Sequence, residues 1–269
     1  MSFSTDIKME LSEINNLAKK DEVKYELLGY LSSENITKIK NTLKYSTENE
    51  YNINRFAKLL KNVGINDFKI EIQGKVYLIS FKSADLENVY IDKVYFAYIL
   101  NGNYDFILYE KEEYNKSFIR GLFLGSGSIN NPNNRYHLEI KIPNDKLMIK
   151  IVEILEKYDI NVKASDKGIY IKDGEEISKF LAFIGASKSV LQFEEIRVQR
   201  DMNNKVNRLV NCKSANLNKT INASIEQINA IKKLKKSGKY RKIDSSLQEL
   251  AELRLKYPDM PLSELRTNA

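Results

Sequence analysis

Seven cationic side chains fall within eleven positions near the end of the chain. A dense run of amines and guanidinium groups neutralises phosphates, which gives affinity for nucleic acid without sequence choice and a steep dependence on salt. We therefore expect this run to contact the phosphates of DNA. Its members are Lys232, Lys233, Lys235, Lys236, Lys239, Arg241 and Lys242.

The remaining residue types argue against metal or covalent chemistry. The chain has one histidine and one cysteine, which excludes a Cys/His zinc site and a disulfide within the chain and is typical of a reducing cytoplasm. His137 has no partner pattern for a general base, so we expect a polar residue of a sheet. The glycines of GLFLGSG at 121–127 fit no phosphate-binding loop, and helix packing is their expected role. We expect no catalytic residue, metal or cofactor.

The charge is unevenly distributed along the 269 residues. From Arg197 to Ala269 there are 16 basic and 7 acidic residues, a balance of +9, which leaves −2 for the first 196 residues out of the total of +7. This asymmetry favours a polyanionic partner, with a solvated basic surface as the alternative. The amino terminus is charged where a signal peptide would be apolar, and apolar runs such as 94–100 are too short to span a bilayer. We expect a cytoplasmic protein without membrane contact.

Hydrophobic periodicity predicts two halves with the same order of elements: helix, strand, helix, strand, strand, helix. The two halves carry helix glycines, Gly29 and Gly121, 92 residues apart, which indicates a duplicated α+β unit. In the first half we predict helices at 4–19, 22–32, 50–63 and 84–100 and strands at 36–45, 68–73 and 76–81. In the second half we predict helices at 113–124, 144–158 and 175–185 and strands at 135–142, 161–165 and 168–172.

The last quarter is predicted to be helical, with asparagine-rich breaks near 203–218. A helix at about 219–236 should end at Gly238, and Ser245 or Ser246 should cap the next helix. Pro258 breaks that helix, and another short helix follows. Two helices joined by a tight turn fit the opening of a helix-turn-helix, although an ordinary helical hairpin has the same pattern.

Three stretches together resemble the WhiA family of bacterial DNA-binding regulators, and the resemblance covers nearly the whole chain. The stretch at 118–140, FIRGLFLGSGSINNPNNRYHLEI, is similar to the second LAGLIDADG motif in the form that WhiA proteins carry. The stretch at 207–231 resembles the linker of the family, and the stretch at 246–265 resembles the first two helices of its helix-turn-helix.

The resemblance implies an α+β fold: a duplicated LAGLIDADG-like domain of αββαββα type, followed by an all-α helix-turn-helix domain. The expected segments are a degenerate first repeat at 1–110, a second repeat at 111–205, a basic helical linker at 206–244 and a partial helix-turn-helix at 245–269. The resemblance also implies a non-catalytic regulator of transcription that binds double-stranded DNA at the nucleoid. Its implied roles lie in sporulation, or in cell division and chromosome segregation.

Nuclease activity would need one metal-binding carboxylate from each repeat, because hard divalent cations prefer oxygen ligands and must neutralise phosphate charge. Alignment on the motif glycines puts Ser126 at this position in the second repeat and Glu34 in the first. One carboxylate cannot build the symmetric metal pair, so we expect no cleavage of DNA. An active homing endonuclease and a protein-interaction scaffold without DNA specificity remain the alternatives.

The sheet surface of LAGLIDADG nucleases straddles the duplex, so the polar faces of the two predicted sheet strands are further candidates for DNA contact. These faces carry Lys38, Lys40 and Lys44 in one repeat and Arg135, His137 and Lys141 in the other, with Glu139 among them. Family members continue beyond the position of Ala269 into the helix that reads bases. The resemblance therefore implies salt-sensitive, weakly selective DNA binding by the 269 residues.

Overall fold

The computed structural model describes residues 2–91, 94–96, 101 and 111–267. The chain divides into two compact units, Met1–Val198 and Gln199–Ala269. Within the described ranges, no helix is long and apolar enough to span a bilayer.

The first unit contains the same arrangement twice. After α1 (Phe3–Ser12), the first copy has α2 (Lys20–Leu31), β1 (Ile36–Ile39), β2 (Thr42–Thr47), α3 (Glu50–Asn62), β3 (Phe68–Gln73) and β4 (Val76–Lys82). The second copy has α5 (Glu112–Ser126), β7 (Gly127–Ile129), β8 (Leu138–Lys141), α6 (Asp145–Lys157), β9 (Lys163–Ser165), β10 (Gly168–Ile171) and α7 (Gly174–Ile184). Their antiparallel sheets have matching strand orders, β1-β2-β4-β3 and β7-β8-β10-β9. The duplicated α+β fold is confirmed.

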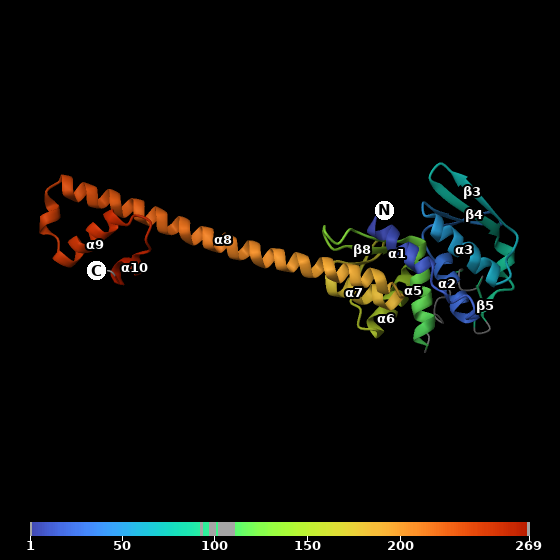
Figure 1. Cartoon of the computed structure of the whole chain (residues 1–269). Helices are drawn as coiled ribbons and strands as arrows, with labels where there is room; N and C mark the ends of the chain where they lie inside the picture. Colours follow the sequence, from blue (N-terminus) through green and yellow to red (C-terminus); the bar gives the residue numbers. More distant parts are fainter. Residues whose placement is uncertain (1, 92–93, 97–100, 102–110, 268–269) are drawn as a thin grey trace. The chain divides into compact units, whose positions relative to one another are not determined.

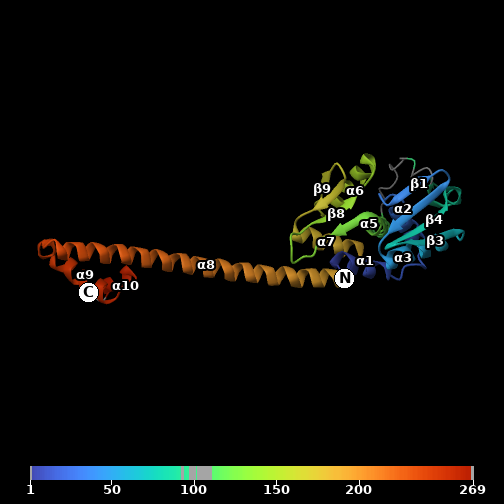
Figure 2. The ribbon, with the colours of Figure 1, turned by 90° about the horizontal axis from the view of Figure 1, so that it is seen from above.

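Helices cover one face of each sheet and leave the other face to solvent (Figure 2). The covered faces carry the inward-pointing apolar residues of the strands, such as Tyr45 and Ile79 in the first sheet and Leu138 and Ile169 in the second, all at most 1% exposed. Most alternate positions on the same strands, such as Lys44, Ser80 and Glu139, are polar, as expected for an antiparallel sheet with one wet face. The central helices α2 and α5 pack against each other between the two sheets (Figures 1 and 2).

The two central helices approach so closely that glycine is required at their crossing. A Cβ atom on Gly121 would lie 2.0 Å from the carbonyl oxygen of Glu26, and one on Gly29 would lie 2.1 Å from that of Phe118. Each glycine therefore faces the carbonyl three residues before the other glycine, which is the relation expected of two equivalent repeats. The predicted packing role of these glycines is confirmed.

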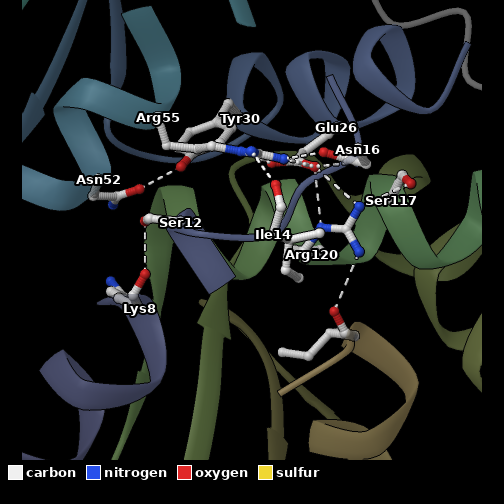
Figure 3. Close-up of polar contacts among 11 residues, drawn as sticks. Lys8, Ser12, Ile14, Asn16, Glu26, Tyr30, Asn52, Arg55, Ser117 and Arg120 are labelled. Carbon is white, nitrogen blue, oxygen red and sulfur yellow. Dashed lines mark hydrogen bonds and ion pairs between the residues drawn. The ribbon is translucent and has the colours of Figure 1, made fainter. Parts of the chain in front are cut away.

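A buried ion cluster lies beside this crossing (Figure 3). The carboxylate of Glu26, 0% exposed, accepts hydrogen bonds from Nε of Arg55 at 2.8 Å, Nε of Arg120 at 3.0 Å and Nδ2 of Asn16 at 3.2 Å. Arg120 also donates to the Ile184 carbonyl, and Arg55 to the Ile14 carbonyl. The cluster joins both repeats, because Glu26 and Arg55 belong to the first and Arg120 to the second.

Three predicted elements of the first repeat are wrong in their extent. The helix predicted at 4–19 ends at Ser12, where asparagine side chains at 15 and 16 favour non-helical backbone. The strand predicted at 36–45 is a hairpin, β1 and β2, because the chain turns at Lys40, which has φ 54°. The helix predicted at 84–100 is replaced over most of its length by a 3-10 turn (Ser83–Leu86), β5 (Tyr90–Ile91) and β6 (Val94–Tyr95). Phe96 is helical, and positions 92–93 and 97–100 lie outside the described residues.

The second repeat and the last quarter also differ from prediction. The stretch at 127–129, for which no strand was predicted, forms β7, the counterpart of β1. The predicted breaks at 203–218 are absent: α8 (Ser187–Lys236) runs through them as one helix. Asparagine lowers helix propensity by only a few tenths of a kcal/mol per residue, about 0.6 at most, and no glycine or proline interrupts this segment.

The second unit consists of α8 from residue 199 onward, a 3-10 turn (Lys239–Lys242), α9 (Ser245–Lys256) and α10 (Leu262–Thr267). Gly238 has φ 71° after α8, as predicted for its cap. Asp244, rather than a serine, caps α9 by accepting a hydrogen bond from the backbone of Ser246 at 2.9 Å. Both views in Figures 1 and 2 place α9 and α10 alongside the C-terminal part of α8.

Candidate nucleic-acid interface

The two positions that would hold metal ligands in a nuclease lie at the ends of α2 and α5. These ends meet, because Nδ2 of Asn35 donates to the Gly125 carbonyl at 2.7 Å. Ser126 is 9% exposed, and its hydroxyl donates to the Lys141 carbonyl at 2.7 Å. The ammonium of Lys141 lies 3.4 Å from the carboxylate of Glu34. Lys141 thus contacts both positions, once through its backbone and once through its charge.

This arrangement opposes binding of a divalent cation. A lysine ammonium already neutralises the one carboxylate, and a second cation nearby would be repelled. Within the described part of the chain, no three His, Cys, Asp or Glu side chains cluster in a way that could hold a metal ion. The ammonium of Lys141 is a group at this junction that can contact a phosphate electrostatically.

The hairpin changes which lysines of the first sheet share a face. Residues directly opposite in an antiparallel pair point to the same side. Lys38 lies opposite Leu43, which is buried on the helix-covered face, whereas Lys44 lies opposite Thr37 on the open face. Lys40 is at the tip of the hairpin. The predicted single basic face of Lys38, Lys40 and Lys44 is therefore wrong, because continuous alternation was assumed through a turn.

The open face of the first sheet also carries Lys69 and Lys82, which were not predicted to lie there. Lys44 pairs in register with Ser80, and Ser80 with Lys69, while Thr42 pairs with Lys82, so all three lysines share this face. Lys69 forms an ion pair with Glu71, and Lys82 lies 3.5 Å from Asp67. Strand pairing was the missing information: β3 and β4 could be placed beside β2 only by the tertiary structure.

The open face of the second sheet is mixed in charge. Lys141, Glu139 and His137 point to this side, where Nε2 of His137 lies 3.2 Å from the Glu139 carboxylate. His137 is the residue directly before β8, so it lies at the end of the strand rather than within it. Arg135 is exposed but lies in the loop before β8 rather than in the strand. Only Lys141 among the three predicted basic residues is therefore placed on the sheet as expected.

The cationic run of the second unit is exposed on the surface. Lys232, Lys233, Lys235 and Lys236 occupy the last turns of α8, and Lys239, Arg241 and Lys242 form the 3-10 turn. Lys235 pairs with Glu252 of α9 at 2.6 Å and lies over the ring of Tyr240, so it also fastens the helical hairpin. The other six form no ion pair with any residue that the structure describes.

A buried arginine positions the turn between α9 and α10. Arg254 is 4% exposed, donates to the Met260 carbonyl at 2.5 Å and to the Pro258 carbonyl at 3.3 Å, and contacts Gln227 of α8 at 2.9 Å. The Ser224 hydroxyl also donates to the Pro258 carbonyl. The helix–turn–helix segment is thus held on one face of α8.

The comparisons with known proteins agree along the chain. Residues 115–203 match the WhiA LAGLIDADG-like domain, and residues 206–269 match the WhiA C-terminal HTH domain. Proteins named "Probable cell division protein WhiA" from Clostridium tetani and Enterococcus faecalis are each 35% identical, over 98% of this chain and 90% and 89% of their own lengths. The crystal structure of full-length DUF199/WhiA from Thermatoga maritima is 26% identical, with a TM-score of 0.63, over 100% of this chain and 91% of that one.

Proposed function

The chain belongs to the WhiA family, and from this we propose that it is a non-catalytic regulator of transcription that binds double-stranded DNA at the nucleoid in the cytoplasm. The observation that carries the proposal is the exposed cationic surface at the junction of α8 and α9. We further propose a role in cell division and chromosome segregation or in sporulation, supported by the cell-division names of its relatives.

The open faces of the sheets are a weaker candidate for DNA contact. Lys44 is half-buried there, and Lys69, Lys82, Lys141 and the loop residue Arg135 are exposed. Several of these lysines are already paired with carboxylates, which reduces the charge offered to a phosphate. Lys38 and Lys40 lie off this face, at the hairpin. We therefore propose that most of the binding free energy comes from the second unit.

Removing charge from the 3-10 turn should weaken DNA binding and flatten its salt dependence. Replacing Lys239, Arg241 and Lys242 with glutamine removes three phosphate contacts, which should lower the slope of log K against log salt by about 2.7. The measurement is fluorescence anisotropy with a labelled duplex over a series of salt concentrations.

The matched control changes the net charge equally on exposed helices of the first unit. Glutamine at Lys58, Lys61 and Lys146 should leave the slope nearly unchanged. Equal effects of the two triple variants would show that the cationic surface contributes to DNA binding only through the net charge of the protein. Absence of DNA binding by the unmodified chain would remove the proposal and favour a protein-interaction scaffold.

The pure protein should not cleave duplex DNA in the presence of Mg²⁺. Ser126 supplies no negative charge for a metal ion, and the carboxylate of Glu34 is already paired with the ammonium of Lys141. The measurement is conversion of supercoiled plasmid to nicked or linear forms, run alongside the Glu34→Gln variant. Cleavage that the variant loses would establish a nuclease, whereas cleavage that the variant retains would come from a contaminating enzyme.

A further inference from the structure

Six asparagines lie in a single row along α8. They are Asn204, Asn207, Asn211, Asn218, Asn222 and Asn229, separated by three, four or seven residues. These separations return to the same side of a helix with 3.6 residues per turn. All six side chains are exposed. Four of the six, from Asn204 to Asn218, fall in the stretch where the sequence alone predicted breaks in the helix.

Basic residues extend and flank the row. Arg200 continues it on one end, and Lys232 and Lys236 continue it on the other, each at a spacing of three or four residues. Arg208 and Lys219 stand beside it, one residue after Asn207 and Asn218. From residue 197 to 236 the helix carries ten basic residues and two acidic ones, Asp201 and Glu226. The helix that carries the row therefore has a net charge of +8 over these residues.

The row faces away from the rest of its unit. The α8 side chains that bind the α9–α10 segment are Ser224 and Gln227, through the Pro258 carbonyl and Arg254. Gln227 lies close to half a turn from Asn222 and from Asn229 around the helix axis. Neither α9 nor α10 covers the row, because all six of its side chains are exposed.

The asparagines do not serve the stability of the helix. Asparagine has a lower helix propensity than alanine, and only contacts made by its side chain could offset this cost. Within the described residues, none of the six amides has a hydrogen-bond partner. Each therefore presents a free donor and a free acceptor to solvent, on a backbone that is already ordered.

This combination fits the major groove of duplex DNA. The groove admits an α-helix, and an asparagine amide pairs with the N6 and N7 atoms of adenine, while arginine and lysine bind phosphates. Continuous basic helices in other DNA-binding proteins use the groove in this way. A helix of a protein partner would instead need apolar anchors, and Ile225 is the only large apolar residue in the row.

We propose that α8 is itself a DNA-reading element, with the segment from Asn204 to Asn218, about 21 Å long, in the major groove. This inference rests on the proposed DNA-binding function and names a second surface for it. The asparagines would select base pairs, and Arg208 and Lys219 would hold the adjacent phosphates.

The test begins with two matched alanine variants of the full chain, Asn211→Ala in the row and Asn216→Ala on the opposite side of α8. Both changes improve helix propensity, so a loss of binding cannot come from unfolding of the helix. The probe is the set of duplexes that the unmodified chain selects from a pool with a randomised centre. Asn211→Ala should reduce affinity for these duplexes about 5- to 100-fold without changing the salt slope, and Asn216→Ala should have no effect.

Cross-linking provides a readout that does not depend on affinity. Cys212 is the single cysteine of the chain, so a Cys212→Ser background accepts one photoreactive group at Asn211→Cys or at Asn216→Cys. Cross-links to DNA from position 211 and not from position 216 would support the proposal.

Equal cross-linking from both positions, or none from 211, would overturn the inference about α8 even if the chain binds DNA through the 3-10 turn. The same holds if Asn211→Ala and Asn216→Ala bind the selected duplexes equally well. The two proposals can therefore fail separately. If the triple variant of Lys239, Arg241 and Lys242 loses DNA binding and Asn211→Ala does not, the proposed function is supported and the inference about α8 is wrong.

Discussion

Replacing Gly121 with alanine is expected to destabilise the first unit by about 3 kcal/mol or more. The added Cβ would lie 2.0 Å from the carbonyl oxygen of Glu26 and 2.8 Å from its carbonyl carbon. These are backbone atoms of a packed helix, so they cannot rotate away as a side chain would. The helices must separate, and the contacts along α2 and α5 weaken together. The measurement is the free energy of unfolding from chemical denaturation, followed by circular dichroism.

Gly64→Ala is the matched control for this substitution. Gly64 has φ +92°, but a Cβ there meets no atom within 4 Å. Its alanine variant should lose only about 1–2 kcal/mol, the cost of left-handed backbone for a residue with a side chain. Equal losses at the two positions would show that backbone strain, rather than the close approach of the helices, explains the requirement for glycine.

Replacing Glu26 with glutamine is expected to cost about 3–5 kcal/mol, because two buried guanidinium groups would lose their common counter-ion. The glutamine NH2 group would also point a donor at donors of Arg55 or Arg120. The control is Glu153→Gln. Glu153 forms a surface ion pair with Lys150 at 3.1 Å, which should contribute less than about 1 kcal/mol to the free energy of unfolding. Similar losses for both variants would contradict the special role of the buried cluster.

The contribution of Glu26 should depend on pH. Burial alone would raise the pKa of the Glu26 carboxyl, but the charges of Arg120 and Arg55 outweigh it and hold this pKa below its usual value. A carboxyl with a lowered pKa in the folded state contributes stability above its unfolded pKa, about 4.3, and loses it as pH falls through the folded value. The difference in unfolding free energy between the unmodified chain and Glu26→Gln should therefore be constant near neutral pH and shrink below about pH 4.

Residue periodicity and the spacing of the two glycines were sufficient to predict the duplication. Gly29 and Gly121 indicated equivalent helices, and alternating apolar residues located β3, β4, β8 and β10 within a few residues. These features are local, because burial of one face imposes a period of two on a strand and 3.6 on a helix. The cationic run at 232–242 was likewise evident from charge alone, and the structure added the contacts of Lys235 with Glu252 and Tyr240.

Contacts between distant residues could not be predicted in this way. Lys38 and Lys44 were assigned to one face because the turn at Lys40 lacks the glycine that would have announced a hairpin. The pairing of Lys141 with Glu34 and the cluster of Glu26, Arg55 and Arg120 join residues 29 to 107 positions apart. Such pairs leave no periodic signal, because each depends on how the helices and sheets pack.

The asparagines of α8 illustrate the same division. Composition alone suggested a break at 203–218, since asparagine favours turns and caps over helix interiors. The structure shows one helix, and only its regular geometry places six of these residues in one exposed row. Sequence by itself thus determined the repeats, the local elements and the charge of this protein. The tertiary structure decided which charges are neutralised and which faces are open, because those depend on atoms brought together across the fold.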